Sequence, residues 1–134
     1  MHIVKTTLND IDVYLTEIKN AIRKNRYRIE LNPHRQDNRD LFFTYVIDET
    51  MAKDILMGLT ADDFSEILKN EHKGYEHELL YVFGKEVKLL ERMGSTSRSV
   101  CLYIKLNKLN KADNCYVIVV SLHEQKYPIQ YYFK

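Results

Sequence analysis

The fold is decided by two stretches near the C-terminal end: residues 100–106, Val-Cys-Leu-Tyr-Ile-Lys-Leu, and residues 115–123, Cys-Tyr-Val-Ile-Val-Val-Ser-Leu-His. Both have the alternating or apolar pattern of a β-strand, so they predict an antiparallel hairpin with its turn at residues 112–114. The even-numbered side chains of both strands then form one apolar face, which we expect helices to cover. The odd-numbered positions form the opposite face, and a one-residue slip would mix the two.

The opposite, polar face of this hairpin gathers Tyr103, Lys105, Ser121 and His123. The predicted register sets Tyr103 across from His123, and Lys105 across from Ser121. A histidine can act as general acid or base near neutral pH, a lysine can stabilise charge that develops on a phosphate, and a tyrosine can contact phosphate or stack on a base. This set suits cleavage of RNA, whose own 2′-OH is the nucleophile, so that neither metal nor cofactor is needed. A plain solvated sheet face carries similar residues, and that alternative stays open.

The N-terminal part of the chain predicts a helix followed by irregular segments. Apolar residues recur at helical spacing over 11–22, and Thr7 or Asn9 can serve as the N-cap. A short strand over 27–31 and a polar loop over 32–39 follow. The apolar run at 41–47 fits either a strand or a helix.

The middle of the chain predicts two short helices and then strands. Residues 50–57 predict one helix, and a capping box at the start of 60–68 predicts the next. Strands are expected at 78–83 and, as its hairpin partner, at 86–90. The tail, 125–134, either adds an edge strand or lies over the sheet. This order argues for an α+β fold in which N-terminal helices pack on an antiparallel sheet formed mainly by the C-terminal half.

The composition is that of an ordinary globular protein. The chain has 134 residues, of which 45% are hydrophobic and 29% charged, so we expect residues 1–134 to form a single domain. The longest uncharged apolar run, 115–122, is too short to cross a membrane, and the first residues do not resemble a signal peptide. Two cysteines do not predict a disulfide framework. We therefore expect a cytoplasmic protein with no membrane partner.

The net charge of +1 conceals a segregation of charge along the chain. Residues 19–39 carry seven basic residues and two acids, residues 40–80 carry ten acids and three basic residues, and residues 81–134 carry nine basic residues and four acids. A nearly neutral protein can therefore present a focused positive face to an acidic partner such as RNA. Solvated helix surface is the other explanation of these segments.

Three short motifs stand in a fixed order: residues 58–64, Gly-Leu-Thr-Ala-Asp-Asp-Phe; residues 102–105, Leu-Tyr-Ile-Lys; and residues 119–123, Val-Val-Ser-Leu-His. They resemble the Gly-Leu-Ser-x-x-Asp-Phe, Val-Tyr-Leu-Lys and Ile-Val-Ser-Phe-Lys segments of the MqsR family. These are mRNA-cleaving toxins of bacterial type II toxin–antitoxin systems, within the wider RelE/ParE-like group. The likeness covers residues 55–123 and rests on the order and spacing of the motifs.

The resemblance implies a small RelE-like fold, metal-independent endoribonuclease activity on mRNA and a cognate antitoxin. Tyr103 stands where the family has a catalytic tyrosine, and His123 replaces a functional lysine, which exchanges a fixed charge for a proton carrier. Glu66 replaces a lysine and Glu78 a glutamine near the site; Glu78 is a candidate general base for the 2′-OH. The family lacks the extra hairpin loop expected at 107–111, which could contact RNA, the ribosome or the antitoxin.

Five further residues are candidate substrate contacts: Arg92, Arg98, Ser121, Arg23 and Lys24. Arg92 and Arg98 flank the site strand. Arg23 and Lys24 belong to the first basic segment. No set of histidines and cysteines has the spacing of a zinc site, so we expect no metal. Two other classes of function remain open: a ParE-like toxin that binds a DNA topoisomerase without cleaving RNA, and an RNA- or protein-binding module.

Overall fold

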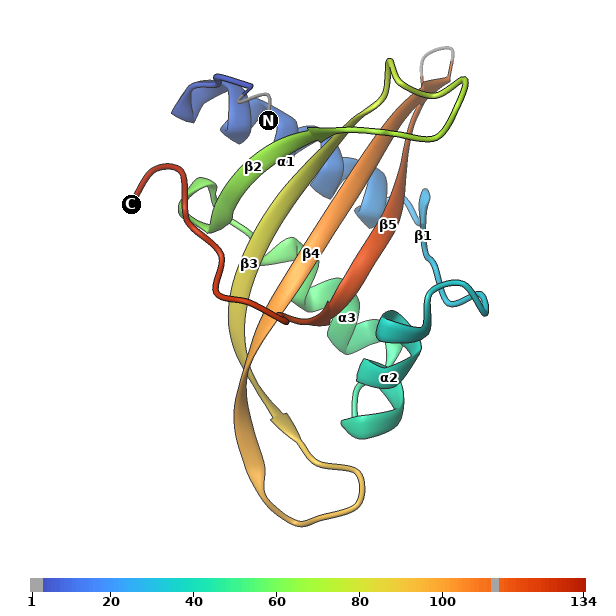
Figure 1. Cartoon of the computed structure of the whole chain (residues 1–134), viewed down its shortest axis with the longest axis vertical. Helices are drawn as coiled ribbons and strands as arrows, with labels where there is room; N and C mark the ends of the chain where they lie inside the picture. Colours follow the sequence, from blue (N-terminus) through green and yellow to red (C-terminus); the bar gives the residue numbers. More distant parts are fainter. Residues whose placement is uncertain (1–3, 112–113) are drawn as a thin grey trace.

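A computed structural model of the chain describes residues 4–111 and 114–134 (Figure 1). The helices are α1 (Leu8–Arg23), α2 (Gln36–Thr44) and α3 (Glu49–Met57), with strand β1 (Tyr27–Ile29) between the first two. A 3₁₀ turn, η1 (Ala61–Asp63), leads into β2 (Phe64–Lys69), β3 (Leu79–Leu90), β4 (Ser97–Lys111) and β5 (Asn114–Glu124). The α+β class is confirmed, with helices packed on a sheet formed mostly by the C-terminal half. Two of the residues expected in the hairpin turn, 112 and 113, lie outside the described residues.

The five strands form one sheet in the order β1-β5-β4-β3-β2. Strands β2 to β5 are antiparallel neighbours, whereas β1 lies parallel to β5, with Tyr27 opposite Val117. The expected antiparallel sheet of the C-terminal half therefore gains one parallel strand, β1, at this edge. Parallel neighbours need a long connection, and here the connection between β1 and β5 contains most of the fold.

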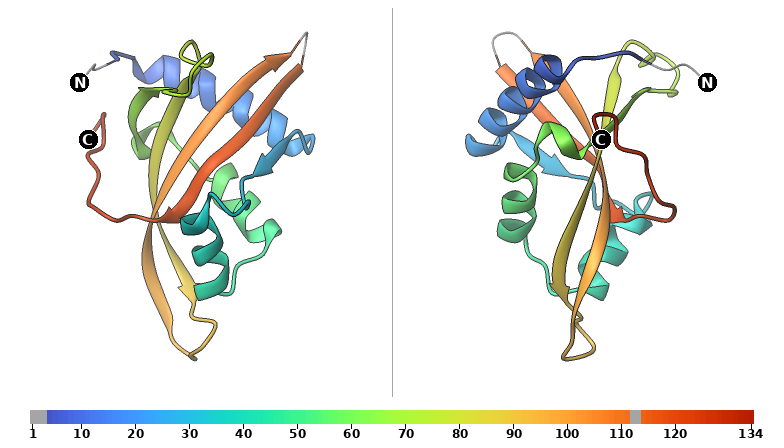
Figure 2. Two further views of the ribbon diagram at one scale, coloured as in Figure 1. Left: turned by 45° about the vertical axis from the view of Figure 1, so that its right-hand side comes forward. Right: turned by 90° about the vertical axis from the view of Figure 1, so that its left-hand side faces the viewer.

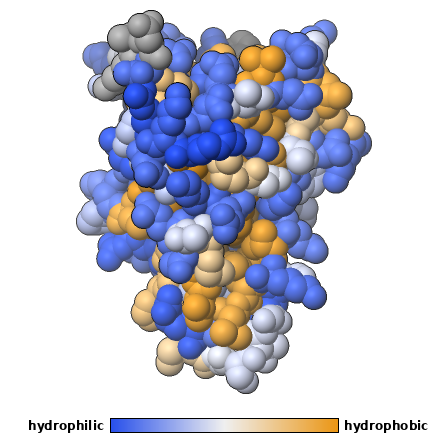
Figure 3. Space-filling view, turned by 180° about the vertical axis from the view of Figure 1, so that it is seen from behind, coloured by the Kyte–Doolittle hydropathy of each residue, from blue (hydrophilic) through white to orange (hydrophobic). Residues whose placement is uncertain are grey.

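The sheet has a covered face and an open face. Helices α1 and α3 lie behind the sheet in Figure 1, on what we call the helix face, and the turned views in Figure 2 show the C-terminal tail on the other side, the outer face. The core lies between helices and sheet and includes Ile11, Ile18, Leu102 and Ile104, all fully buried. Seen from the helix side, hydrophobic patches lie among hydrophilic surface in both the upper and the lower half of the molecule (Figure 3).

Helix α1 begins as the sequence predicts. Thr7 is the N-cap: its hydroxyl accepts the Asp10 N–H at 3.1 Å, and the Asp10 carboxylate accepts the Thr7 N–H at 3.3 Å. This reciprocal pair satisfies two amide groups that the first turn leaves free.

None of the helices in the described residues is long and apolar enough to cross a membrane.

The helix predicted over 60–68 is wrong beyond Asp63. The capping box forms, with the Thr60 N–H donating to Asp63 at 2.9 Å, but it supports only the single 3₁₀ turn η1. The chain then continues as β2, whose Glu66 lies opposite Val82 of β3. Apolar residues at 64, 67 and 68 fit either period, and pairing with β3 overrides the local helix signal.

Strand β3 runs unbroken through Gly84, so the predicted hairpin between 78–83 and 86–90 is wrong. Gly84 is needed for another reason: the tail crosses the outer face there. A Cβ on Gly84 would collide with the Ile129 side chain and would lie 2.6 Å from the Tyr131 hydroxyl oxygen. Of the two placements expected for the tail, it therefore adopts the one over the sheet.

Strand β5 contains a bulge that divides it into two halves. The predicted register is confirmed near its end, where Tyr103 lies opposite His123 and Lys105 opposite Ser121. The register then shifts, so that Leu106 lies opposite Val119. Beyond the bulge the odd-numbered residues of β5 point to the core, so the expected even-numbered apolar face is wrong there. Residues 107–111 also continue β4 and do not form the expected loop.

Helix α2 occupies the region where the sequence left most open. The polar loop expected over 32–39 ends at Arg35, and the helix runs from Gln36 into the apolar run that fitted either a strand or a helix. Arg92 binds the C-terminal end of α2. Its guanidinium donates to the carbonyl oxygens of Phe42, Phe43 and Tyr45 at 2.9–3.1 Å.

Candidate active site

The outer face of the β4–β5 hairpin brings Tyr103 and His123 into direct contact. Their ring centroids are 5.2 Å apart and the ring planes differ by 14°, so the rings stack. The contact follows from the register, because the two residues are direct cross-strand neighbours on one face. Both side chains are partly exposed, so the pair is open to a ligand from solvent.

The neighbouring backbone fixes the proton on the His123 ring. Nδ1 lies 2.9 Å from the carbonyl oxygen of Glu124. Because a carbonyl oxygen only accepts hydrogen bonds, Nδ1 carries a proton, and in the neutral ring Nε2 is the free acceptor. This arrangement suits a general base that uses Nε2.

Tyr103 is suited to donate a hydrogen bond rather than to remove a proton. Burial, and then the negative charge of Glu66, raise the pKa of Tyr103 above its ordinary value. The hydroxyl therefore keeps its proton through the physiological range. The same interaction places Glu66, on β2, close enough to influence the outer face.

Lys105 lies two residues after Tyr103 on β4, on the same face of the sheet. Its cross-strand neighbours are Val82 and Ser121, both buried, and its own side chain is half-buried. Burial, and then the positive charge of Arg35, lower the pKa of Lys105. Among the described residues, no carboxylate lies within ion-pair distance of either cation. Two uncompensated positive charges on a partly dry surface are a natural binding site for an anion.

A large cavity opens beside this cationic pair. It has a volume of about 1320 Å³ and contains both Lys105 and Arg35 in its wall. The loop between β2 and β3, residues 70–78, borders it on one side and the segment around Glu30 on the other. Side chains of Leu80, Ile118 and Val120 supply apolar wall. The volume exceeds the roughly 300–1,000 Å³ of small-molecule pockets, so it has room for a segment of a polymer.

Glu78 lies at the far end of the same cavity. Its Oε1 accepts from Asn70 Nδ2 at 3.1 Å and from Asn107 Nδ2 at 3.0 Å. Tyr103 and Asn107 are four positions apart on β4, which corresponds to about 13 Å along a strand. Glu78 therefore shares the cavity with Lys105 but does not face His123, and the two cannot act on the same proton.

Four of the candidate substrate contacts lie away from this site. Arg92 is engaged with the end of α2, as described above. Arg98 occupies an even-numbered position of β4 and therefore faces the opposite side of the sheet from Tyr103; its charge acts on buried Tyr45. Arg23 and Lys24 end helix α1, which covers the helix face, and are exposed there. Ser121 lies in the row of Lys105 but is 5% exposed, too buried to contact RNA directly.

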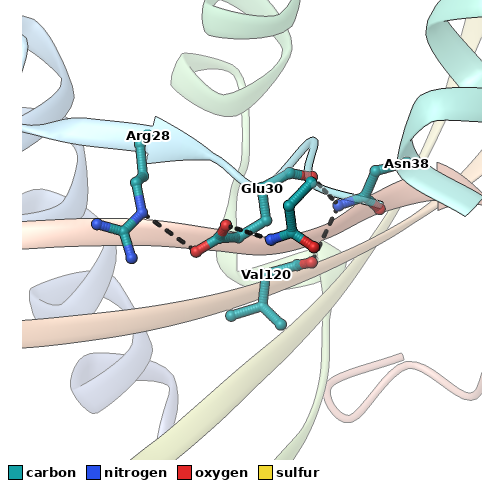
Figure 4. A network of polar contacts seen from close by, with 5 residues as sticks. Arg28, Glu30, Asn38 and Val120 are labelled. Atoms are coloured by element: carbon teal, nitrogen blue, oxygen red, sulfur yellow. Dashed lines mark hydrogen bonds and ion pairs between the residues drawn. The ribbon is translucent and has the colours of Figure 1, made fainter. Parts of the chain in front are cut away.

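Sequence reasoning missed Asn38, a side chain of α2 that binds backbone groups beside the bulge of β5 (Figure 4). This side chain is 1% exposed; its amide donates to the carbonyl oxygens of Glu30 at 2.8 Å and Val120 at 3.0 Å, and its oxygen accepts the Leu122 N–H at 2.9 Å. It thereby replaces a neighbouring strand at the bulge, just before His123. Its spacing from Leu41 and Tyr45, a helical three and seven, is the signal that could have revealed it.

Sequence reasoning also missed Arg35, because the sequence of a polar loop does not indicate that one of its residues lies near Lys105. Among the described residues, no group of three or more His, Cys, Asp or Glu side chains is placed to hold a metal ion. The two cysteines are both free, and burial raises the pKa of each thiol. Neither is an activated nucleophile.

Comparison with known proteins identifies no relative: no family model, no curated protein and no solved structure matches this chain.

Proposed function

We propose that this protein is a metal-independent endoribonuclease that cleaves mRNA, and that it is the toxin of a type II toxin–antitoxin system. The observation that carries the proposal is the stacked Tyr103–His123 pair with the unpaired Lys105 beside it, on an open sheet face. These three residues supply a proton carrier, a hydrogen-bond donor and a positive charge. RNA supplies the nucleophile, so the set is chemically sufficient.

In the proposed reaction His123 Nε2 takes the proton of a ribose 2′-OH. The 2′-oxygen forms a bond to phosphorus, and the bond from phosphorus to the 5′-oxygen breaks. The 5′-oxygen takes up a proton, from the imidazolium or from water. The products are a 2′,3′-cyclic phosphate and a 5′-hydroxyl. Lys105 stabilises the negative charge of the phosphorane, and the Tyr103 hydroxyl donates to a phosphate oxygen.

The biological role follows from the same activity. A cytoplasmic mRNA nuclease stops translation and growth, so the cell that makes it needs a neutralising antitoxin. Exposed apolar side chains away from the site support a protein partner: Phe43 is 71% and Met93 89% exposed. Such a surface is a candidate for the antitoxin interface. The ribosome is a second candidate partner, as the place where the protein would meet mRNA.

The test is induced expression in bacteria with mapping of RNA ends. We expect growth arrest with new mRNA ends that carry a 2′,3′-cyclic phosphate and a 5′-hydroxyl. The matched control is His123→Ala, which we expect to express, fold and leave mRNA intact. Intact mRNA together with broken DNA in the wild-type culture would instead assign a topoisomerase-directed toxin. Intact mRNA and intact DNA with retained RNA binding would assign a binding module.

A further inference from the structure

We propose that the cavity beside Lys105 binds the nucleotide next to the scissile phosphate, and that Glu78 selects a base that carries an exocyclic amine. The inference rests on the proposed RNA cleavage and adds a determinant of sequence specificity to it. It also changes the expected part of Glu78, from a general base to a residue that contacts the base edge.

The two ends of the cavity differ in charge. Lys105 and Arg35 make one end positive, while the loop end carries three carboxylates, Glu71, Glu76 and Glu78, together with Lys69 and Lys73. Glu30, in the opposite wall, is neutralised by Arg28 at 3.1 Å. A phosphate is attracted to Lys105 and Arg35, which form no ion pair among the described residues, and is repelled by the Glu78 carboxylate. A nucleotide whose phosphate lies at Lys105 then points its base to Glu78.

The Glu78 carboxylate is held in place for such a contact. Two amide donors, Asn70 and Asn107, both bind Oε1, while Oε2 has no hydrogen-bond partner among the described residues. Asn107 is 5% exposed, and its own Oδ1 is too buried to meet a ligand. The acceptor that this end of the cavity offers is therefore Oε2 of Glu78. An ionised carboxylate can only accept.

Base chemistry decides which nucleotide fits this acceptor. Cytosine, adenine and guanine each present an exocyclic amine, which donates. Uracil presents carbonyl oxygens in place of that amine, and a carbonyl facing a carboxylate is repelled. The apolar side chains of Leu80, Ile118 and Val120 line the cavity between the two ends and can cover the face of a base. Lys105 and Asn107 are two positions apart on β4, about 7 Å along the strand, a span that a single nucleotide bridges.

The test compares CMP with UMP, which differ at one position of the ring, an amine in CMP and a carbonyl in UMP. Titration of the full chain followed by NMR is expected to show CMP binding about tenfold to hundredfold tighter, the range of a good base contact. Glu78→Gln keeps the size and the Oε1 acceptor but replaces Oε2 with a donor, so it should bring the two affinities within about threefold. Glu86→Gln is the matched control on the same sheet face, outside the cavity, and should keep the preference.

Cleavage of RNA pairs that differ only by C or U beside the scissile phosphate gives the second readout. We expect the wild type to prefer C and Glu78→Gln to lose that preference. Equal binding of CMP and UMP by the wild type overturns the inference, and so does loss of cleavage at every sequence in a folded Glu78→Gln protein, which would make Glu78 a proton carrier. A wild type that prefers CMP but cleaves no RNA would refute the nuclease proposal while supporting base selection by Glu78.

Discussion

The imidazole of His123 lies on the ring of Tyr103, with planes 14° apart, and its Nδ1 is held by the next backbone carbonyl. Stacking and hydrogen bond together fix the direction in which Nε2 points. A positioned acid or base typically contributes about 10²–10⁴-fold to a rate. We expect His123→Ala to lose RNA cleavage by that factor while circular dichroism and thermal unfolding stay close to wild type.

Variants of Tyr103 separate the two parts of this contact. Tyr103→Phe keeps the stack and removes the hydroxyl, so we expect a loss of about a hundredfold, the lower end of the range for one transition-state donor. Tyr103→Ala removes both and should lose more. Equal rates for the two variants would show that the hydroxyl alone matters and that the stack has no role.

The alkaline limb of activity should report Lys105. Burial and the charge of Arg35 lower the pKa of this lysine, so it loses its positive charge at a lower pH than an ordinary lysine does. RNA affinity should therefore decline as the pH rises through this lowered pKa. Arg35→Gln removes one of the two causes, so the pKa of Lys105 rises and the decline moves to higher pH. Binding of an RNA with a 2′-deoxy residue at the scissile position, followed across the alkaline range, measures this without cleavage.

Asn38 is expected to be the most sensitive polar residue of the fold. Its removal leaves three backbone groups without this partner, two of them buried, and each buried group costs about 1–3 kcal/mol. We expect Asn38→Ala to lower the free energy of unfolding by roughly 3 kcal/mol or more in urea titrations. Asn38→Asp should be no better, because a carboxylate cannot donate to the carbonyls of Glu30 and Val120. The exposed Asn32→Ala serves as the control.

Gly84 should tolerate no side chain while the tail is in place. Forcing a methyl group into the contact with Ile129 and Tyr131 should cost about 1–3 kcal/mol, the usual range for overpacking. Gly94→Ala is the control, since its nearest neighbour would be 3.7 Å away. Thermal unfolding measures the cost. Limited proteolysis should show faster cleavage of the tail in Gly84→Ala than in Gly94→Ala.

Charge reversal on α1 should show whether the basic residues at its end contribute to RNA cleavage or whether only the cations of the site do. Arg23 and Lys24 are exposed at the end of a helix that covers the opposite face, and salt screens charges over about 10 Å. We expect Arg23→Glu and Lys24→Glu to change RNA cleavage by less than about twofold at physiological salt, whereas Arg35→Glu lowers it by tenfold or more. A large loss in the α1 variants would place RNA along the basic segment instead.

The contact between Tyr103 and His123 could be predicted because alternation along two long strands permits one register that buries the apolar residues. The bulge at Val120 could not, since residues 116–120 are all apolar and fit either face. The 3₁₀ turn after Thr60 misled for a related reason: a capping box signals how a helix starts and carries no information on where it stops. Pairing with β3 decides that instead.

The cavity lay beyond sequence reasoning because its walls come from separate parts of the chain. Lys105 was a candidate on its own strand, but its cationic partner, Arg35, stands in a segment that reads as an ordinary polar loop. Asn38 was hidden in the same way, as a polar residue at a buried position of a helix. Its partners are backbone groups, and those leave no trace in the amino-acid pattern.

The parallel pairing of Tyr27 with Val117 joins two strands that lie far apart in the sequence. Closing a loop of that length costs chain entropy before any native contact compensates for it, and folds with such pairings form slowly. Arg35 follows β1 closely in sequence, so its approach to Lys105 depends on the same closure. A chain that has formed only its local hairpins therefore has the stacked pair without the anion site. Both parts of the candidate site are therefore present together only in the completely folded molecule.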